Sequence, residues 1–131
     1  MTNVTAPPRP TSTPAGVRLC PLDQIVDPGS HGFVLKLRAG YFHGFAVRVR
    51  GTVRGYVDRC PHAGVPLTRG VDDYLVKGGL IACQWHGALF RAQDGVCVGG
   101  PCNGAALTPW PLTVEDGWIV TAGEREGGLP G

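Results

Sequence analysis

Two short stretches decide the fold of this chain: Cys60-Pro61-His62-Ala63-Gly64 and, further along, Cys83-Gln84-Trp85-His86-Gly87. Each stretch offers one thiol and one imidazole, in the patterns Cys-x-His and Cys-x-x-His. Thiolate sulfur and imidazole nitrogen are soft and borderline ligands that bind transition metals. The four side chains therefore indicate one metal site. Its predicted ligands are Cys60, His62, Cys83 and His86.

Zinc is the first metal to weigh, because it binds the same side chains. A zinc site usually takes each pair of ligands from a turn with about two to four intervening residues, most often Cys with Cys and His with His. Here the first pair has a single intervening residue, and each stretch mixes the two ligand types. This pattern suits a binuclear [2Fe–2S] centre better, with both thiolates on one iron and both imidazoles on the other. Zinc, or a chance cluster of buried Cys and surface His, is the alternative.

The residues before the first stretch have the pattern of β-strands. Apolar and polar side chains alternate along residues 33–38, 45–50 and 53–58, as they do in half-buried strands. Further short strands fit residues 79–83, 88–92, 107–114 and 118–121, with a hairpin turn at 115–117. The sequence therefore predicts an all-β fold, an antiparallel sandwich or barrel.

The turn after residue 50 can be placed by register. A two-residue loop at 51–52 would put Arg50 opposite Val53 and mix the two faces of the hairpin. A three-residue loop at 51–53 pairs Val49 with Gly55 and keeps the apolar residues together, so we predict this loop.

Composition narrows the possible functions. The chain has 131 residues, 12 Lys and Arg against 10 Asp and Glu, 21 Gly and 12 Pro. This length favours one domain, and a net charge of +2 gives no broad cationic field for a nucleic acid. No apolar run approaches the roughly 18 residues of a membrane span. We expect neither nucleic acid nor membrane as a partner, and many short strands joined by tight turns.

The two ends of the chain look unlike its middle. Residues 1–16 are rich in Pro and Thr and lack the apolar core of a signal peptide, so we expect a disordered tail and a cytoplasmic protein. Residues 123–131 are charged and Gly-rich and are expected to form a second tail. The predicted domain is residues 17–122.

With these features in place, the sequence resembles the Rieske iron–sulfur family. The resemblance rests on the two ligand stretches, an opening segment at 17–22, Phe90, Gly99-Gly100-Pro101 and a closing hairpin at 107–121. It implies a Rieske fold, with a β-sandwich or barrel base and a small cluster-binding subdomain at about 58–104. It also implies one [2Fe–2S] cluster per chain, with Cys60 and Cys83 on one iron and both imidazoles on the other. The third loop, 99–101, would lean over the cluster.

The residues near the predicted ligands indicate a low reduction potential. High-potential members of the family carry a disulfide between the two ligand loops, and the corresponding positions here are Val65 and Trp85. Those members also place a Ser two residues after the second His, where this chain has Ala88. Hydrogen bonds to cluster sulfur raise the potential, so fewer donors should lower it. Backbone N–H groups around Ala63, Gly64, Gly87 and Ala88 are still expected to donate to sulfur.

The resemblance implies electron transfer and no catalytic residues. A Rieske oxygenase needs a further catalytic domain with its own iron site, which a chain of this length is not expected to supply. We expect a Rieske-type ferredoxin, monomeric when free. It would take electrons from an NAD(P)H- and flavin-dependent reductase and pass them to a terminal oxygenase that hydroxylates aromatic rings, docking near His62 and His86. The alternatives are a small Rieske subunit of a larger redox enzyme, such as a nitrite reductase, or a domain with a regulatory role.

The remaining Cys, His and basic residues are given plainer roles. Buried packing is expected for Cys20, Cys97 and Cys102, because Cys is among the most buried residue types. His31 and His43 are expected in solvated loops. A basic strip is predicted on one sheet, formed by Lys36, Arg38, Arg48, Arg50 and Arg54.

Overall fold

The computed structural model describes residues 10–59, 75–83, 87–100 and 104–122. Their regular secondary structure is strand apart from one short 3-10 helix, so the predicted all-β fold is confirmed. The elements are β1 (Arg18–Pro21), η1 (Leu22–Gln24), β2 (Gly29–Leu37), β3 (Gly40–Val49), β4 (Thr52–Val57), β5 (Leu75–Lys77), β6 (Leu80–Ala82), β7 (Leu89–Arg91), β8 (Cys97–Gly99), β9 (Leu112–Glu115) and β10 (Trp118–Thr121). The helix described, η1, spans three residues, which is far too short to cross a membrane.

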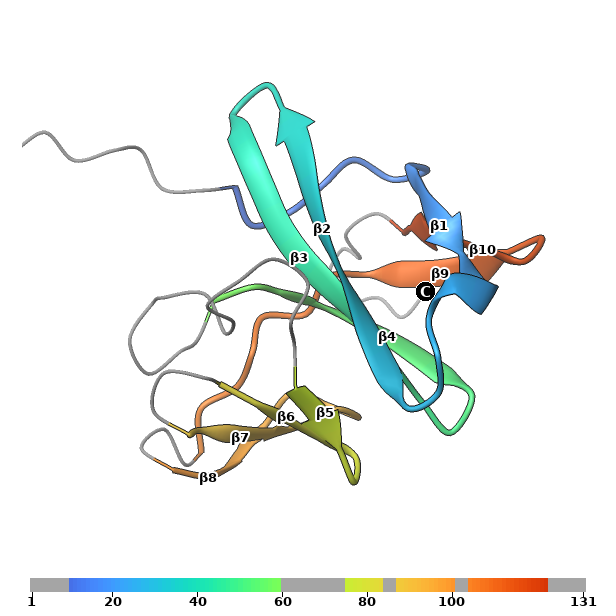
Figure 1. Cartoon of the computed structure of the whole chain (residues 1–131). Helices are drawn as coiled ribbons and strands as arrows, with labels where there is room; N and C mark the ends of the chain where they lie inside the picture. Colours follow the sequence, from blue (N-terminus) through green and yellow to red (C-terminus); the bar gives the residue numbers. More distant parts are fainter. Residues whose placement is uncertain (1–9, 60–74, 84–86, 101–103, 123–131) are drawn as a thin grey trace, which may run out of the picture.

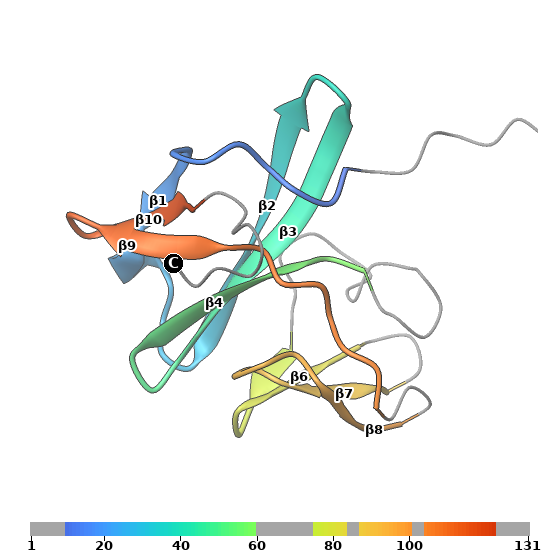
Figure 2. The same cartoon turned by 180° about the vertical axis from the view of Figure 1, so that it is seen from behind.

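The strands form three antiparallel sheets, with the orders β1-β10-β9, β2-β3-β4 and β5-β6-β7-β8. The long β2–β3 hairpin runs through the middle of the molecule, with the four-stranded sheet on one side of it and β1, β9 and β10 on the other (Figures 1 and 2). An isolated bridge between Tyr56 and Pro109 joins β4 to the segment that leads into β9. The bridge thus connects the two three-stranded sheets, which together form the base of the molecule.

The central strand β3 is buried on both faces. Phe45 and Val47 belong to a core cluster shared with the four-stranded sheet, whereas Ala46 belongs to a second cluster shared with β1 and β10. In β2, Phe33 and Leu35 pack inward and Lys36 is exposed, which is the alternation that the sequence predicts. A strand that is buried on both faces has a nearly continuous run of apolar residues. Alternation of apolar and polar residues therefore cannot fix its pairing register.

The predicted three-residue turn between β3 and β4 is wrong. Val49 pairs with Thr52, so the loop has two residues, Arg50 and Gly51, with φ angles of 51° and 79°. Two successive positive φ angles are typical of a type I′ hairpin turn. The Asp27 carboxylate accepts hydrogen bonds from the N–H groups of Arg50 at 2.9 Å and Gly51 at 2.6 Å. These hydrogen bonds from a distant segment stabilise the left-handed backbone conformation of Arg50. The sequence of the turn alone does not reveal them.

Tyr56 ties β4 to the four-stranded sheet. Its ring is buried, and its hydroxyl donates to the Ala92 carbonyl at 2.7 Å. Burial raises the pKa of Tyr56 to about 12, so the phenol remains a donor even in alkaline solution where a free tyrosine ionises. A buried donor with this fixed acceptor orients the small sheet on the base.

The ordered structure begins before the predicted boundary at residue 17. The Trp110 indole N–H donates to the Thr13 hydroxyl at 2.9 Å, and the Gly16 N–H donates to the Thr121 carbonyl at 2.8 Å. The Thr121 hydroxyl donates to the Pro14 carbonyl at 2.7 Å. Residues 13–16 therefore lie against the base.

Other differences concern short strands and two His residues. β5 and β8, of three residues each, are not in the predicted set, and β9 begins at Leu112 instead of residue 107. His31 and His43 lie in β2 and β3, not in loops. The ring of His31 stacks on Phe33 with a centroid distance of 4.7 Å.

Candidate functional site

Cys83 lies directly after β6, at one end of the four-stranded sheet. Its side chain is buried, with 2% of the residue exposed, in a core cluster with Phe45 and Phe90. Of the four predicted ligands, this is the one that falls within the described residues. A buried thiol at the end of a strand is held in place by packing on every side, as a ligand to a buried metal centre must be.

The backbone closes tightly around the segment that follows Cys83. The Cys83 N–H donates to the Ala88 carbonyl at 2.8 Å, and the Gly87 N–H donates to the Cys83 carbonyl at 3.1 Å. Gly87 has a φ of +75°, a conformation that favours glycine. The β6–β7 connection is therefore pinned on both sides of residues 84–86.

One expectation about this connection is wrong. The Gly87 N–H is not available as a donor to cluster sulfur, because it is already bonded to the Cys83 carbonyl. It stabilises the loop that carries the thiol instead. The expected sulfur contact of the Ala88 N–H stays a prediction, and Ala63 and Gly64 lie outside the described residues.

The third predicted loop packs against the second. Gly100 follows β8 with a φ of +85°, and a Cβ placed on it would lie 2.8 Å from the Ala88 Cα and 3.1 Å from the Gly87 carbonyl oxygen. Backbone thus meets backbone here with no room for a side chain. This contact supports the predicted approach of loop 99–101 to the ligand loop, although Pro101 itself lies outside the described residues.

Gly100→Ala is expected to lower the thermal unfolding midpoint and the iron content of the purified protein together. The positive φ costs an L-residue about 1–2 kcal/mol, and separating the two loops to fit the methyl group costs about 1–3 kcal/mol more. Thermal unfolding and iron analysis measure the two effects.

Gly104→Ala is the matched control for Gly100→Ala. Gly104 also has a positive φ, +96°, but a Cβ there would meet nothing within 4 Å. Gly104→Ala should lower the unfolding midpoint by the strain of the positive φ alone, and the purified protein should keep its iron. Equal losses in the two variants would contradict a specific contact between the loops.

The topology brings the ends of several strands to one side of the molecule. β6 ends, β7 begins and β8 ends at the same edge of the four-stranded sheet, and the end of β4 lies on that side in both views (Figures 1 and 2). After β4 the chain is fixed through Arg59, because the Asp58 N–H donates to the His43 carbonyl at 3.0 Å and the Arg59 N–H to the Val57 carbonyl at 2.9 Å. Both predicted ligand stretches begin from this side.

The other three predicted ligands, Cys60, His62 and His86, lie outside the described residues, as do Val65, Trp85 and Cys102. Within the described ranges, no three His, Cys, Asp or Glu side chains gather as a metal site. The described residues still fit a [2Fe–2S] centre in three respects: a buried thiol, a pinned hairpin loop around it, and a third loop in close backbone contact. The complete ligand set stays a prediction.

Cys20 and Cys97 have the packing role expected of them. They are 4% and 1% exposed and belong to two different core clusters. The Cys97 thiol donates to the Gly99 carbonyl at 3.2 Å. Both side chains are thus part of the hydrophobic core.

The predicted basic strip is broken up. Arg48 turns inward and donates from one terminal nitrogen to the Ile25 carbonyl at 2.9 Å, because the end of η1 leaves that acceptor beside β3. The Arg54 Nε donates to the Gln93 carbonyl at 3.1 Å. Sequence reasoning missed Gln93 and Asp27 as partners of these segments, because both lie far away in the chain and carry no local signal.

Comparisons with known proteins show which family this chain resembles. A family model described as the Rieske [2Fe-2S] domain matches residues 29–114. The ferredoxin component of the p-cumate 2,3-dioxygenase system of Pseudomonas putida is 30% identical over 104 residues, which cover 79% of this chain and 81% of the relative. Other curated relatives are much longer, and the chain spans only 10% to 16% of four of them.

Solved structures share the fold. The ferredoxin of carbazole 1,9a-dioxygenase from Nocardioides aromaticivorans IC177 superposes with a TM-score of 0.65 at 20% identity, over 85% of this chain and all of that one. A complex of reduced oxygenase and oxidised ferredoxin in carbazole 1,9a-dioxygenase contains a chain that matches with a TM-score of 0.65 at 24% identity, over 84% of this chain and 94% of that one. Together with the matched family model, the pinned loop around Cys83 makes this chain a member of the Rieske [2Fe-2S] domain family.

Proposed function

We propose that this protein is a one-electron carrier with a low-potential Rieske [2Fe–2S] cluster, one per chain. Cys60 and Cys83 would hold one iron, and His62 and His86 the other. The observation that carries the proposal is the buried Cys83 thiol in its pinned hairpin loop, in a chain of this family. When bound, such a cluster accepts and returns a single electron.

The described residues shape the site in two ways. The buried apolar cluster around Cys83, which includes Ala88 and Phe90, lowers the local dielectric and keeps water away. The contact of Gly100 with Ala88 holds the third loop against the ligand loop. Rigid surroundings limit the rearrangement that accompanies a change of charge, which favours rapid electron exchange.

The proposed cluster-binding subdomain is residues 58–104, inside a domain of residues 17–122. The region matched by the family model, 29–114, falls within that domain. The predicted compartment is still the cytoplasm.

The proposed partners are a terminal oxygenase, which hydroxylates aromatic rings, and an NAD(P)H- and flavin-dependent reductase. Support for the oxygenase comes from the ferredoxin component of the p-cumate dioxygenase system and from the carbazole dioxygenase complex of oxygenase with ferredoxin. Both partners would dock near His62 and His86, and the free protein would be a monomer.

Protein purified without oxygen tests the proposal. We expect iron and sulfide in the ratio of one [2Fe–2S] cluster per chain, the electron paramagnetic resonance signal of mixed Cys and His ligation after reduction, and a midpoint well below that of respiratory Rieske proteins. Gel filtration of cell lysate should show a free monomer. A colourless zinc protein, or stable migration with one large enzyme, would contradict the proposal.

Ala88→Ser is expected to raise the midpoint potential. The residue is fully buried next to the ligand loop, and a hydroxyl at this place can donate to a cluster sulfur. A net hydrogen bond of about 1 kcal/mol corresponds to about 40 mV for a one-electron couple. Redox titration measures the shift.

Ala92→Ser is the matched control, because Ala92 is 3% exposed in the same core cluster but lies at the other end of β7. It should leave the potential unchanged. If Ala88→Ser has the same midpoint potential as the native protein, the absence of a hydroxyl at position 88 is not a cause of a low potential.

A further inference from the structure

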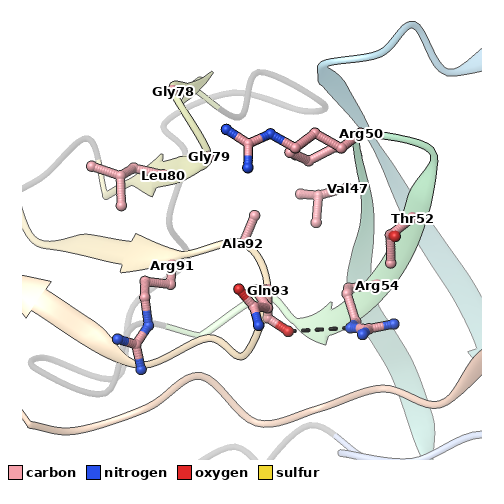
Figure 3. Close-up of a pocket in the computed structure, with 11 residues that line it drawn as sticks. Val47, Arg50, Thr52, Arg54, Gly78, Gly79, Leu80, Arg91, Ala92 and Gln93 are labelled. Atoms are coloured by element: carbon pink, nitrogen blue, oxygen red, sulfur yellow. Dashed lines mark hydrogen bonds between the residues drawn. The ribbon is translucent and has the colours of Figure 1, made fainter.

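A pocket of about 420 Å³ lies at the start of β6 and the end of β7 (Figure 3). Cys83 follows the other end of β6. The pocket opens between the β3–β4 hairpin and the turns that join β5 to β6 and β7 to β8. Its volume falls within the range of sites for small organic molecules. The described residues that line it are Val47, Val49, Arg50, Thr52, Arg54, Gly78, Gly79, Leu80, Arg91, Ala92 and Gln93.

The floor of the pocket is apolar and fixed. Val47 is 1% exposed and Ala92 is 3% exposed, and Val49 and Leu80 are half-buried beside them. The Ala92 N–H donates to the Gly79 carbonyl at 2.8 Å, and its carbonyl accepts from Tyr56. A hydrocarbon group laid on this floor would displace water from a surface that is already formed.

The rim of the pocket is cationic. It carries three guanidinium groups, and none of the described lining residues is acidic. Arg91 is neutralised by Asp94, which accepts from its Nε at 3.0 Å and from a terminal nitrogen at 2.6 Å. Arg54 uses its Nε on the Gln93 carbonyl. Two positive charges, those of Arg50 and Arg54, therefore lie on the rim without a carboxylate partner among the described residues.

Arg50 is the cation best placed for a ligand. Its side chain extends from the β3–β4 turn toward Gly79, while Arg54 and Arg91 lie on either side of Gln93 (Figure 3). Asp27 accepts from the backbone N–H of Arg50 and lies 3.9 Å from the Nε of Arg48. It therefore fixes the turn, and the Arg50 guanidinium makes no ion pair with another described residue.

We propose that this pocket binds a small organic carboxylate, with its hydrocarbon body on the apolar floor and its carboxylate against the Arg50 guanidinium. A planar guanidinium matches a carboxylate with two parallel hydrogen bonds. The pocket lies at the start of β6 and the β6–β7 loop follows the end of β6. A ligand in the pocket would therefore leave the proposed cluster site accessible to a partner protein.

Fluorine magnetic resonance with 4-fluorobenzoate as the probe tests this site on the holoprotein. The native protein should broaden the probe signal saturably. Arg50→Gln should weaken binding about tenfold or more, since one charge-assisted contact is lost. The neutral probe 4-fluorobenzamide should bind much more weakly than 4-fluorobenzoate.

Arg38→Gln is the matched control, because Arg38 is exposed and lies outside the pocket lining. It should bind the probe as the native protein does. The proposal is overturned if 4-fluorobenzoate does not bind, if Arg38→Gln weakens binding as much as Arg50→Gln, or if inorganic phosphate binds as well as the probe. The cluster spectrum, recorded on each variant, reports the electron carrier independently.

Discussion

Cys83→Ala is expected to abolish the [2Fe–2S] cluster, so that the purified protein loses essentially all of its iron and its visible absorption. The proposed ligation by the Cys83 thiolate cannot be replaced by the methyl group of Ala. Nor can solvent supply a ligand readily, because the residue is 2% exposed. Iron analysis and the visible spectrum of protein made without oxygen measure the loss.

Cys97→Ala separates ligation from packing. Cys97 is 1% exposed and belongs to the same core cluster as Cys83, so the two variants remove the same atom from the same core. Both should lose some stability, but Cys97→Ala should keep its cluster. A full complement of iron in folded Cys83→Ala protein, or equal loss of iron from both variants, would show that Cys83 is not a ligand.

The candidate ligand residues can be proposed from the sequence alone because their pattern is local. Cys60 and His62 form one short pattern and Cys83 and His86 another, and no other part of the chain is needed to read them. The strand predictions were best where one face is buried and the other exposed, as in β2. The turn at Arg50 was wrong because β3 is buried on both faces and because the stabilising carboxylate, Asp27, comes from a distant segment.

The pocket and the order of the N-terminal segment could not be predicted, because both depend on contacts between distant residues. The pocket needs the β3–β4 hairpin beside Gly79 and Ala92. Thr13 is ordered by Trp110, nearly one hundred residues later in the chain. Residues 10–16 are rich in Pro and Thr. This composition does not reveal which hydrogen-bond donors and acceptors of the base lie next to them.

Trp110→Ala is expected to destabilise the protein by about 3–5 kcal/mol, the largest effect of a packing substitution in this chain. Trp110 is 1% exposed, and its ring lies 4.7 Å from that of Phe42 and 5.9 Å from that of Phe33. Two strands leave space for it: a Cβ on Gly44 would lie 2.7 Å from the Trp110 ring, and a Cβ on Gly55 would lie 2.5 Å from its carbonyl oxygen.

Trp118→Ala is the matched control, because Trp118 is half-buried and its ring contacts the Arg18 guanidinium at 4.5 Å. Loss of that contact should cost about 1 kcal/mol. The unfolding midpoint of Trp110→Phe should lie between those of the other two variants, because this variant keeps an aromatic ring but loses the hydrogen bond to Thr13. Thermal unfolding of the three variants measures the order. Because Trp110 joins β3 and β4 to the segment entering β9, equal midpoints for Trp110→Ala and Trp118→Ala would mean that the base is not held together at this point.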